Sequence, residues 1–175
     1  MSRPALRRPV RPAAVLLVTS CLLATSACGV LLPGSEPVRD EAGAITEADD
    51  AADVFSIAVG DCTDDAEDAS STEAEEISTV AVVPCGEPHD NEVYASVLLD
   101  DGDYPGLEVV EAEADERCLG EFEGFVGAAY EESAYDYWPM YPTAESWATG
   151  DREILCLVYH GELEKVTGTL KAIGG

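Results

Sequence analysis

Residues 107–130 have the sequence LEVVEAEADERCLGEFEGFVGAAY. Apolar positions follow one another in this segment at steps of three or four residues: Val110, Ala114, Cys118, Phe122, Phe125 and Ala129. This spacing predicts an amphipathic helix with Cys118 on the face turned toward the core. Glycines at positions 120, 124 and 127 each lower helix propensity by up to about 1 kcal/mol, so we expect the helix to depend on packing.

A second apolar segment, residues 154–159, is apolar on both of its alternating faces. This pattern is typical of a central strand that is covered on both sides. Cys156 would then face the helix and Cys118. Together the two segments predict an α+β domain in which one main amphipathic helix packs across a small antiparallel sheet.

Further strands are predicted for residues 54–59, 77–83 and 89–99, with a weak final strand at 166–172. Between the second and third of these, Cys85-Gly86-Glu87-Pro88 has the composition of a turn, so we expect a hairpin or a bulged pair of neighbouring strands. Residues 63–76 are dense in Asp, Glu and Ser and predict an exposed acidic loop.

The amino terminus has the three parts of a signal peptide. Four arginines precede an apolar run at residues 13–24, which is shorter than the roughly 20 residues that span a bilayer as a helix. Ser26 and Ala27 directly before Cys28 resemble a lipoprotein lipobox, although Thr25 stands where an aliphatic residue is usual. We therefore expect residues 1–28 to be a lipoprotein signal with Cys28 as the lipidated residue. Ordinary cleavage nearby, which would release the protein, is the alternative.

The next segment, residues 29–53, is rich in Pro, Gly, Ala and acidic residues and has almost no large apolar side chain after Leu32. Such a composition buries too little surface to fold. We expect an acidic, disordered tether here and a folded domain at residues 54–175.

The charge of the chain is strongly negative, with 36 acidic residues, nine basic residues and a net charge of −27. All of the acids follow Cys28, where the remaining bases are Arg39, Arg117, Arg152, Lys165 and Lys171. This charge excludes nucleic acid as a partner, because binding requires positive groups that neutralise phosphates. It also repels anionic lipid headgroups.

Four cysteines remain after Cys28, which in a small exported domain predicts two disulfides. Of the three connectivities, we favour Cys62–Cys85 and Cys118–Cys156, because each pair joins neighbouring segments of the expected fold. Zinc binding is the competing use of these cysteines. The sequence has no Cys-x-x-Cys and only two histidines, so we expect no metal site and no cofactor.

Half of the twelve aromatic residues lie between positions 130 and 147, where two prolines predict an irregular loop. The candidate binding residues in this loop are Tyr135, Tyr137, Trp138, Tyr141 and Trp147. An exposed cluster of this kind could stack on sugar rings or grip a peptide. The alternative, which we favour, is that the rings form core and a lid over the helix.

No catalytic residue can be assigned from the sequence. His89 follows Cys85 by four positions, but an oxidised cysteine is no nucleophile, and a structural role for His89 at a turn is the favoured interpretation. Arg152 is a further candidate ligand-binding residue, with pairing to a local carboxylate as the alternative. We expect the protein not to be an enzyme.

An ordered set of short motifs suggests a family. Gly60-x-Cys62, Pro84-Cys85-x-x-Pro88-His89-x-x-Glu92, Cys118 within a helix, Trp147-x-x-Gly150-Asp151-Arg152-x-x-x-Cys156 and Gly168-Thr169-Leu170-Lys171 resemble the septum-formation-related domain of actinobacterial envelope proteins. The resemblance implies a membrane-tethered, exported protein with a link to cell division or envelope assembly. It supplies no catalytic residues.

Two functional hypotheses remain. The first is a lipid-anchored binding or scaffold module on the outer face of the cytoplasmic membrane, whose partner is an envelope protein or a wall polymer. The second is a small envelope hydrolase that uses His89 with a carboxylate.

Overall fold

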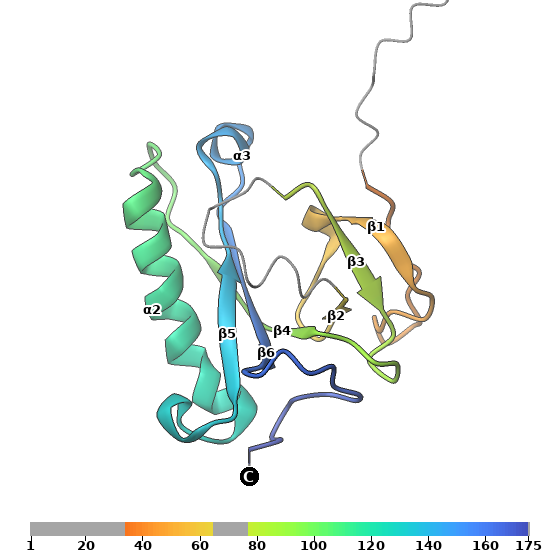
Figure 1. Cartoon of the computed structure of the whole chain (residues 1–175). Helices are drawn as coiled ribbons and strands as arrows, with labels where there is room; N and C mark the ends of the chain where they lie inside the picture. The colour runs from red at the N-terminus through yellow and green to blue at the C-terminus, as the bar shows by residue number, and fades with distance from the viewer. Residues whose placement is uncertain (1–33, 65–76, 175) are drawn as a thin grey trace, which may run out of the picture. The chain divides into compact units, whose positions relative to one another are not determined.

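A computed structural model of the chain describes residues 34–64 and 77–174 (Figure 1). The helices in these ranges are α2 (Leu107–Val126) and α3 (Ala144–Thr149), with single 3-10 turns η1 (Val54–Ser56) and η2 (Tyr130–Glu132). The strands are β1 (Asp49–Asp53), β2 (Cys62–Thr63), β3 (Thr79–Val83), β4 (Asn91–Leu98), β5 (Tyr135–Met140) and β6 (Glu153–His160). All neighbouring strands are antiparallel, in the order β1-β3-β2-β4-β6-β5. The predicted α+β fold with one main helix is confirmed.

Helix α2 buries the first four residues of the predicted stripe, Val110, Ala114, Cys118 and Phe122. At its end the buried residue is Val126, whereas Phe125 is half-buried and Ala129 lies beyond the helix. The helix ends four residues earlier than expected, at Val126. The next residue, Gly127, takes the left-handed conformation (φ 85°), and its N–H caps the carbonyl of Glu123. A residue without a Cβ adopts this conformation without strain, so it ends the helix there.

Strand β6 lies between β4 and β5 and is buried on both faces, as predicted. Ile154, Cys156 and Val158 point into a core that they share with α2. Leu155 and Leu157 point the other way. Ile154, Cys156 and Val158 form a core with the apolar side of α2, which we call the helix-side core. The predicted disulfide Cys118–Cys156 crosses this core with a Cα–Cα distance of 5.4 Å.

A second core lies on the opposite face of β6. Its buried side chains come from β1, β3, β4 and β6 and from the segments before β1 and before β2: Ile45, Ala52, Ile57, Val80, Val82, Val93, Leu155 and Leu157. Strands β3 and β6 are not neighbours in the sheet, yet their side chains meet in this core. In Figure 1 strands β1, β3 and β2 lie on the side of β6 away from α2.

The prediction of a disordered tether over residues 29–53 is wrong for residues 34–53. This segment makes bridges between Ser35 and Ala52 and between Arg39 and Ile45, and it ends in β1, which pairs with β3. Composition misled because backbone hydrogen bonds, the ion pair of Arg39 with Asp61 and the burial of only a few apolar side chains, such as Ile45 and Ala52, are enough to hold the segment. Residues 29–33 lie outside the described residues.

The strand expected at residues 54–59 is also wrong, because Val54–Ser56 form the 3-10 turn η1. The strand in this region is the two-residue β2, which lies between β3 and β4 and pairs with both. The predicted hairpin of 77–83 with 89–99 is therefore wrong as well, although both strands exist. Of the expected acidic loop, residues 65–76 lie outside the described residues.

The aromatic segment is more regular than expected. Residues 135–140 form the edge strand β5, and Pro139 is tolerated there because an edge strand leaves some N–H groups unpaired. The next helix, α3, begins with a capping box between Thr143 and Ser146.

The weak strand expected at 166–172 is reduced to a single bridge between Val166 and His89. In the ranges that the structure describes, no helix combines the length and the apolar character needed to span a bilayer. The predicted signal peptide and Cys28 lie outside the described residues.

Candidate functional site

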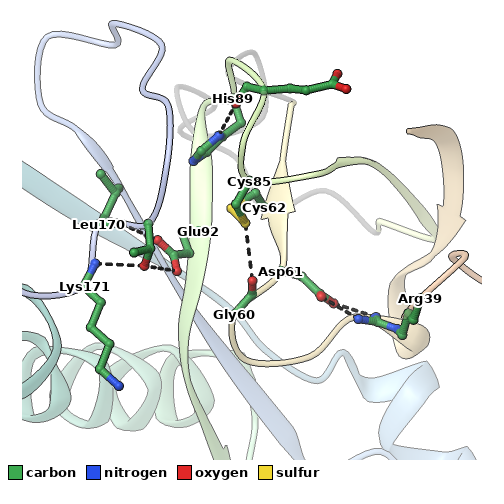
Figure 2. The surroundings of a disulfide bond; sticks show 11 residues. Arg39, Gly60, Asp61, Cys62, Cys85, His89, Glu92, Leu170 and Lys171 are labelled. Carbon is green, nitrogen blue, oxygen red and sulfur yellow. Dashed lines mark hydrogen bonds and ion pairs between the residues drawn. A yellow bond between two sulfur atoms is a disulfide. The ribbon is translucent and has the colours of Figure 1, made fainter. Parts of the chain in front are cut away.

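Several of the sequence motifs meet around the disulfide Cys62–Cys85 (Figure 2). This bond joins β2 to the turn that precedes β4, with a Cα–Cα distance of 5.3 Å, and confirms the predicted pairing. Cys62 is buried and Cys85 is half-buried. Around the bond lie Asp61, His89 and Glu92, three buried side chains that carry polar or charged groups. Each therefore needs a partner that offsets its loss of water.

Asp61 finds its partner in the segment that was expected to be a tether. Its carboxylate accepts hydrogen bonds of 2.5 and 2.6 Å from the Arg39 guanidinium and a third of 2.7 Å from the Ala58 N–H. Arg39 also donates to the Ser56 and Gly43 carbonyls. The hydrogen bond to Asp61 raises the pKa of Arg39. Arg39 thus fastens the amino-terminal segment to the domain.

His89 has an exposed fraction of 0%. Its Nδ1 lies 2.8 Å from the Glu87 carbonyl, which can only accept, so Nδ1 carries the proton and donates. Its backbone exchanges two hydrogen bonds with Val166. Within the described part of the chain Nε2 has no hydrogen-bond partner. The buried ring cannot reach a solvent-borne substrate, so its position gives the hydrolase hypothesis no support.

Next to His89, Lys165 bridges two carboxylates. Its Nζ contacts Asp64 at the end of β2 and lies 3.3 Å from Asp90 Oδ2. The hydrogen bond to Asp64 raises the pKa of Lys165. Burial is the largest single influence on Asp64 and opposes its charge, but the hydrogen bonds with Lys165 and Asp90, together with the nearby positive charge of Lys165, leave the pKa of Asp64 lowered. The cluster ties residue 165 to β2 and to the start of β4.

Glu92, with an exposed fraction of 3%, binds the same C-terminal segment further along. One oxygen accepts from the Thr169 hydroxyl at 2.7 Å and the other from the Leu170 N–H at 2.5 Å. Leu170 inserts into the helix-side core. The His-x-x-Glu pair of the motif therefore anchors residues 166–170, and neither side chain is presented to solvent.

Two tyrosines of the aromatic segment are held by hydrogen bonds to α2. Tyr137 donates to Asp115 at 2.8 Å and Tyr141 donates to Glu111 at 2.9 Å, both on α2. Burial, followed by the hydrogen bond to Glu111, raises the pKa of Tyr141 to about 12. Burial, followed by the hydrogen bond to Asp115, raises the pKa of Tyr137 above its ordinary value. These rings form a lid over the helix, which matches the favoured interpretation.

The other aromatic candidates are held in the same way. Trp138 packs partly against the second core, and its indole N–H donates to Asn91 at 3.0 Å. Tyr135 stacks edge-on against His160 at a centroid distance of 5.5 Å. These positions do not bring the predicted binding residues together into one exposed cluster.

Arg152 lies over Trp147, with its guanidinium carbon 3.8 Å from the ring centroid. It donates to the Trp147 carbonyl at 2.9 Å, and its Nε is 3.6 Å from the exposed Asp101 carboxylate. The Trp147 indole donates to the Gly102 carbonyl. The contact between Arg152 and Trp147 closes the turn between α3 and β6. The carboxylate beside Arg152 comes from Asp101, in the segment before α2, and not from a residue near Arg152 in the sequence.

One grouping was missed from the sequence. Within residues 34–64 and 77–174, His160, Glu162 and Glu164 are placed so that one ligand atom from each lies within 4.8 Å of the other two. The signal was present as a His-x-Glu-x-Glu spacing just after the central strand, but among 36 acidic residues it did not stand out.

Residues 24–156 match the sequence profile of the Septum formation family. No curated protein and no solved structure matches the chain. The family match points to a septum-related role at the cell envelope. Because it spans more than half of the chain and includes all four disulfide-bonded cysteines, the chain belongs to the Septum formation family.

Proposed function

We propose that the protein is a lipid-anchored binding or scaffold module on the outer face of the cytoplasmic membrane, where it takes part in septum formation. The observation that carries this proposal is membership of the Septum formation family. The sequence of the first 28 residues supports the anchor, since an apolar run precedes Ser26, Ala27 and Cys28. A cysteine that carries two or more acyl chains holds a protein at a membrane stably, whereas one chain is marginal.

Binding without catalysis fits the chemistry of the described residues. The four described cysteines are oxidised, so none of them supplies a thiolate nucleophile. His89 is buried, and Glu92 is occupied by the C-terminal segment. The polar groups of the motifs hold the fold together, which leaves the surface as the part that meets a partner.

The surface of α2 favours particular partners. Its exposed face carries Glu108, Glu116 and Glu123 beside the exposed apolar side chain of Leu119. The helix has one base, Arg117, which pairs with Glu113 at 2.7 Å. Such a face suits a neutral or basic envelope protein or wall polymer and disfavours nucleic acid and anionic lipid headgroups.

The anchor is tested with a Cys28→Ser variant, compared with the wild-type chain and with Cys21→Ser as the matched control. Cys21 lies in the apolar run and would leave with the signal. We expect wild type and C21S to sediment with membranes and to be digested by protease added to wall-free cells. C28S should be released from the membrane or should keep its uncleaved signal peptide. Protection of the wild type from external protease would contradict the proposal.

The septal role is tested by chemical crosslinking in intact cells, followed by identification of the captured proteins. Wild type should capture division or wall-assembly proteins. A variant with Glu108, Glu116 and Glu123 changed to Gln should capture them more weakly. The control removes the same charge elsewhere, with Glu41→Gln, Glu47→Gln and Asp50→Asn, which are exposed on the amino-terminal segment. Equal loss in both variants would mean that overall charge, and not the α2 face, governs the contact.

A further inference from the structure

The folded domain begins close to the proposed lipid anchor. Only five residues, 29–33, separate Cys28 from Gly34, the first residue that the structure describes. The peptide between these two positions reaches at most about 20 Å when fully extended. A domain of this size is roughly 35 to 40 Å across. An anchor at Cys28 therefore keeps the amino-terminal end of the domain next to the bilayer.

Gly34 lies against the residues that lead into η1. A Cβ at position 34 would meet the backbone of Ala52 and Asp53, so glycine permits this close approach. The Asp53 N–H donates to the Ser35 carbonyl at 2.9 Å, which holds the entering chain in place. The chain from the anchor therefore joins the domain beside Asp53, two residues before Phe55.

Phe55 points into solvent from a fixed backbone. Its side chain is 67% exposed, and of the twelve aromatic residues, all of which lie in the described ranges, it alone has an exposed side chain. The Phe55 N–H donates to the Asp53 carboxylate at 2.9 Å, while Val54 and Ile57 on either side pack in the second core. The η1 turn cannot bury Phe55 without losing these contacts.

The next turn exposes a second apolar side chain. A hydrogen bond of 3.0 Å from the Asp61 N–H to the Ala58 carbonyl closes this turn, and Gly60 in it has a φ of 93°, which favours glycine. Val59 lies at the tip and is 52% exposed. The Gly60 N–H donates to a carbonyl of β4 at 2.8 Å, so the tip has a fixed position.

Phe55 and Val59 lie in a neutral part of a strongly acidic chain. Residues 54–60, VFSIAVG, include no charged side chain. Asp61, which follows, is buried and paired with Arg39, and Asp53, which precedes, is half-buried and caps η1. More distant acids act over only about 8 Å at physiological salt, because ions screen their charge. The repulsion between the chain and anionic headgroups is therefore reduced at this surface.

We propose that the surface formed by Phe55 and Val59 lies against the lipid bilayer, with both side chains inserted into the headgroup region. Insertion is favourable because their apolar area leaves water. The inference rests on the proposed lipid anchor, which supplies most of the affinity by keeping this surface at a high effective concentration beside the membrane.

This contact would orient the whole domain. The strands of the amino-terminal half lie on the side of β6 away from α2 (Figure 1). With Phe55 at the membrane, the acidic exposed face of α2 is turned away from the bilayer, where a partner can reach it.

The test uses the mature lipidated chain in vesicles of phosphatidylcholine and phosphatidylglycerol at physiological salt, with a small fraction of a lipid that carries a photoactivatable diazirine near its headgroup. After illumination, mass spectrometry of peptides locates the label. Peptides that contain residues 54–60 should be labelled, and peptides of α2 should not. Phe55→Ser/Val59→Ser should lower the labelling at 54–60 by at least about fivefold, because burial of these side chains provides the contact.

The matched control is Val109→Ser/Leu119→Ser, which removes two exposed apolar side chains from α2 and should leave the labelling at 54–60 unchanged. Phe55→Trp gives a second readout on a surface that stays apolar. Compared with the wild type, this variant should gain fluorescence that lipids brominated near the headgroup quench.

The outcomes separate this inference from the anchor on which it rests. A lipidated chain with no label at 54–60, with equal label on α2, or with equal label in the serine variant overturns the inference alone. Crosslinks through residues 54–60 between two copies of the chain, in place of the lipid label, also overturn it, because the surface would then join copies. A chain recovered from cells without acyl groups on Cys28 overturns the anchor and the inference together.

Discussion

The two halves of the sheet are stabilised in different ways. The helix-side half, formed by α2, β4, β5 and β6, encloses large side chains such as Phe122 and Tyr94, whose rings meet edge to face at 6.1 Å. In the core of the amino-terminal half, formed by residues 34–64 and β3, the buried apolar side chains are aliphatic or small, and Trp138 and Met140 pack against them from β5. The segments of this half are held by the Arg39–Asp61 pair and the disulfide Cys62–Cys85.

This difference has a physical consequence. Burial of apolar area is non-directional, so the helix-side half tolerates small shifts of its parts. Buried polar groups hold only while every partner is in place, because a lost partner leaves a charge or a donor without water. We therefore expect substitutions in the two halves to be costly for different reasons, and the following four predictions test this expectation from the largest effect to the smallest.

Phe122→Ala should cause the largest loss. Phe122 is fully buried and contacts the rings of Tyr94, Tyr130 and Tyr137. Removing the ring should lower the free energy of unfolding by about 3 to 5 kcal/mol, measured by denaturant unfolding of the oxidised protein. The control, Leu119→Ala on the exposed face of α2, should change it by less than about 0.5 kcal/mol. A loss below 1 kcal/mol for Phe122→Ala would mean that the helix-side core is not the main apolar core.

Asp61→Asn tests the amino-terminal half. The substitution removes the charge that pairs with Arg39, a side chain that is 24% exposed, so partial hydration of the guanidinium reduces the penalty. We expect a loss of about 2 kcal/mol by the same denaturant measurement. Protease should also cut the amino-terminal segment sooner. Glu113→Gln, which breaks the exposed pair with Arg117, is the matched control and should cost less than about 0.5 kcal/mol. Equal losses in the two variants would show that Arg39 does not anchor the segment.

Glu92→Gln should act on the C-terminal segment with a smaller global effect. Glutamine keeps the shape of the side chain but presents one acceptor oxygen to the two donors, Thr169 and Leu170. We expect a loss of about 1 to 2 kcal/mol in stability. The Leu170 amide should exchange with deuterium faster than in the wild type, while amides of α2 keep their protection. Unchanged exchange at Leu170 would contradict the anchoring role of Glu92.

Alkaline pH should lower the stability of the helix-side half. The raised tyrosine pKa values should have no effect on stability at neutral pH. Burial together with the charge of Asp136 raises the pKa of Tyr159 to about 12, and burial with the hydrogen bond to Glu111 does the same for Tyr141. The native state therefore keeps protons that the unfolded chain loses above pH about 10. Stability should be fully present below that pH and fall as pH rises toward 12. Tyr141→Phe should flatten this fall, as measured by denaturant unfolding across the range. An unchanged slope would show that Tyr141 is not a contributor.

The sequence predicted the helix-side half more accurately than the amino-terminal half. Helical spacing in α2 and the apolar run of β6 predicted both elements, and the placement of Cys118 and Cys156 on facing sides predicted their disulfide. The amino-terminal half was missed because its stability depends on pairings between distant residues, such as Arg39 with Asp61, which leave no periodic signal.

The roles of the motif residues were predictable only in part, again because their partners are distant in the sequence. Sequence reasoning assigned His89 a structural role at a turn, and the structure places it there. It could not anticipate that Glu92 and Lys165 hold the C-terminal segment, because their partners lie some 75 residues or more away along the chain. Pro139 suggested a loop, but its place at the sheet edge allowed a strand.

Two disulfides hold the chain, one in each half of the sheet, and the proposed function requires that they form after export. The sharpest test is mass spectrometry of peptides from the protein, isolated from its own cells without reduction and with free thiols blocked at once. We expect cross-linked peptides that join Cys62 to Cys85 and Cys118 to Cys156, with acyl chains on Cys28. Blocked free thiols at these four positions, on a chain that still retains its first 28 residues, would contradict the account.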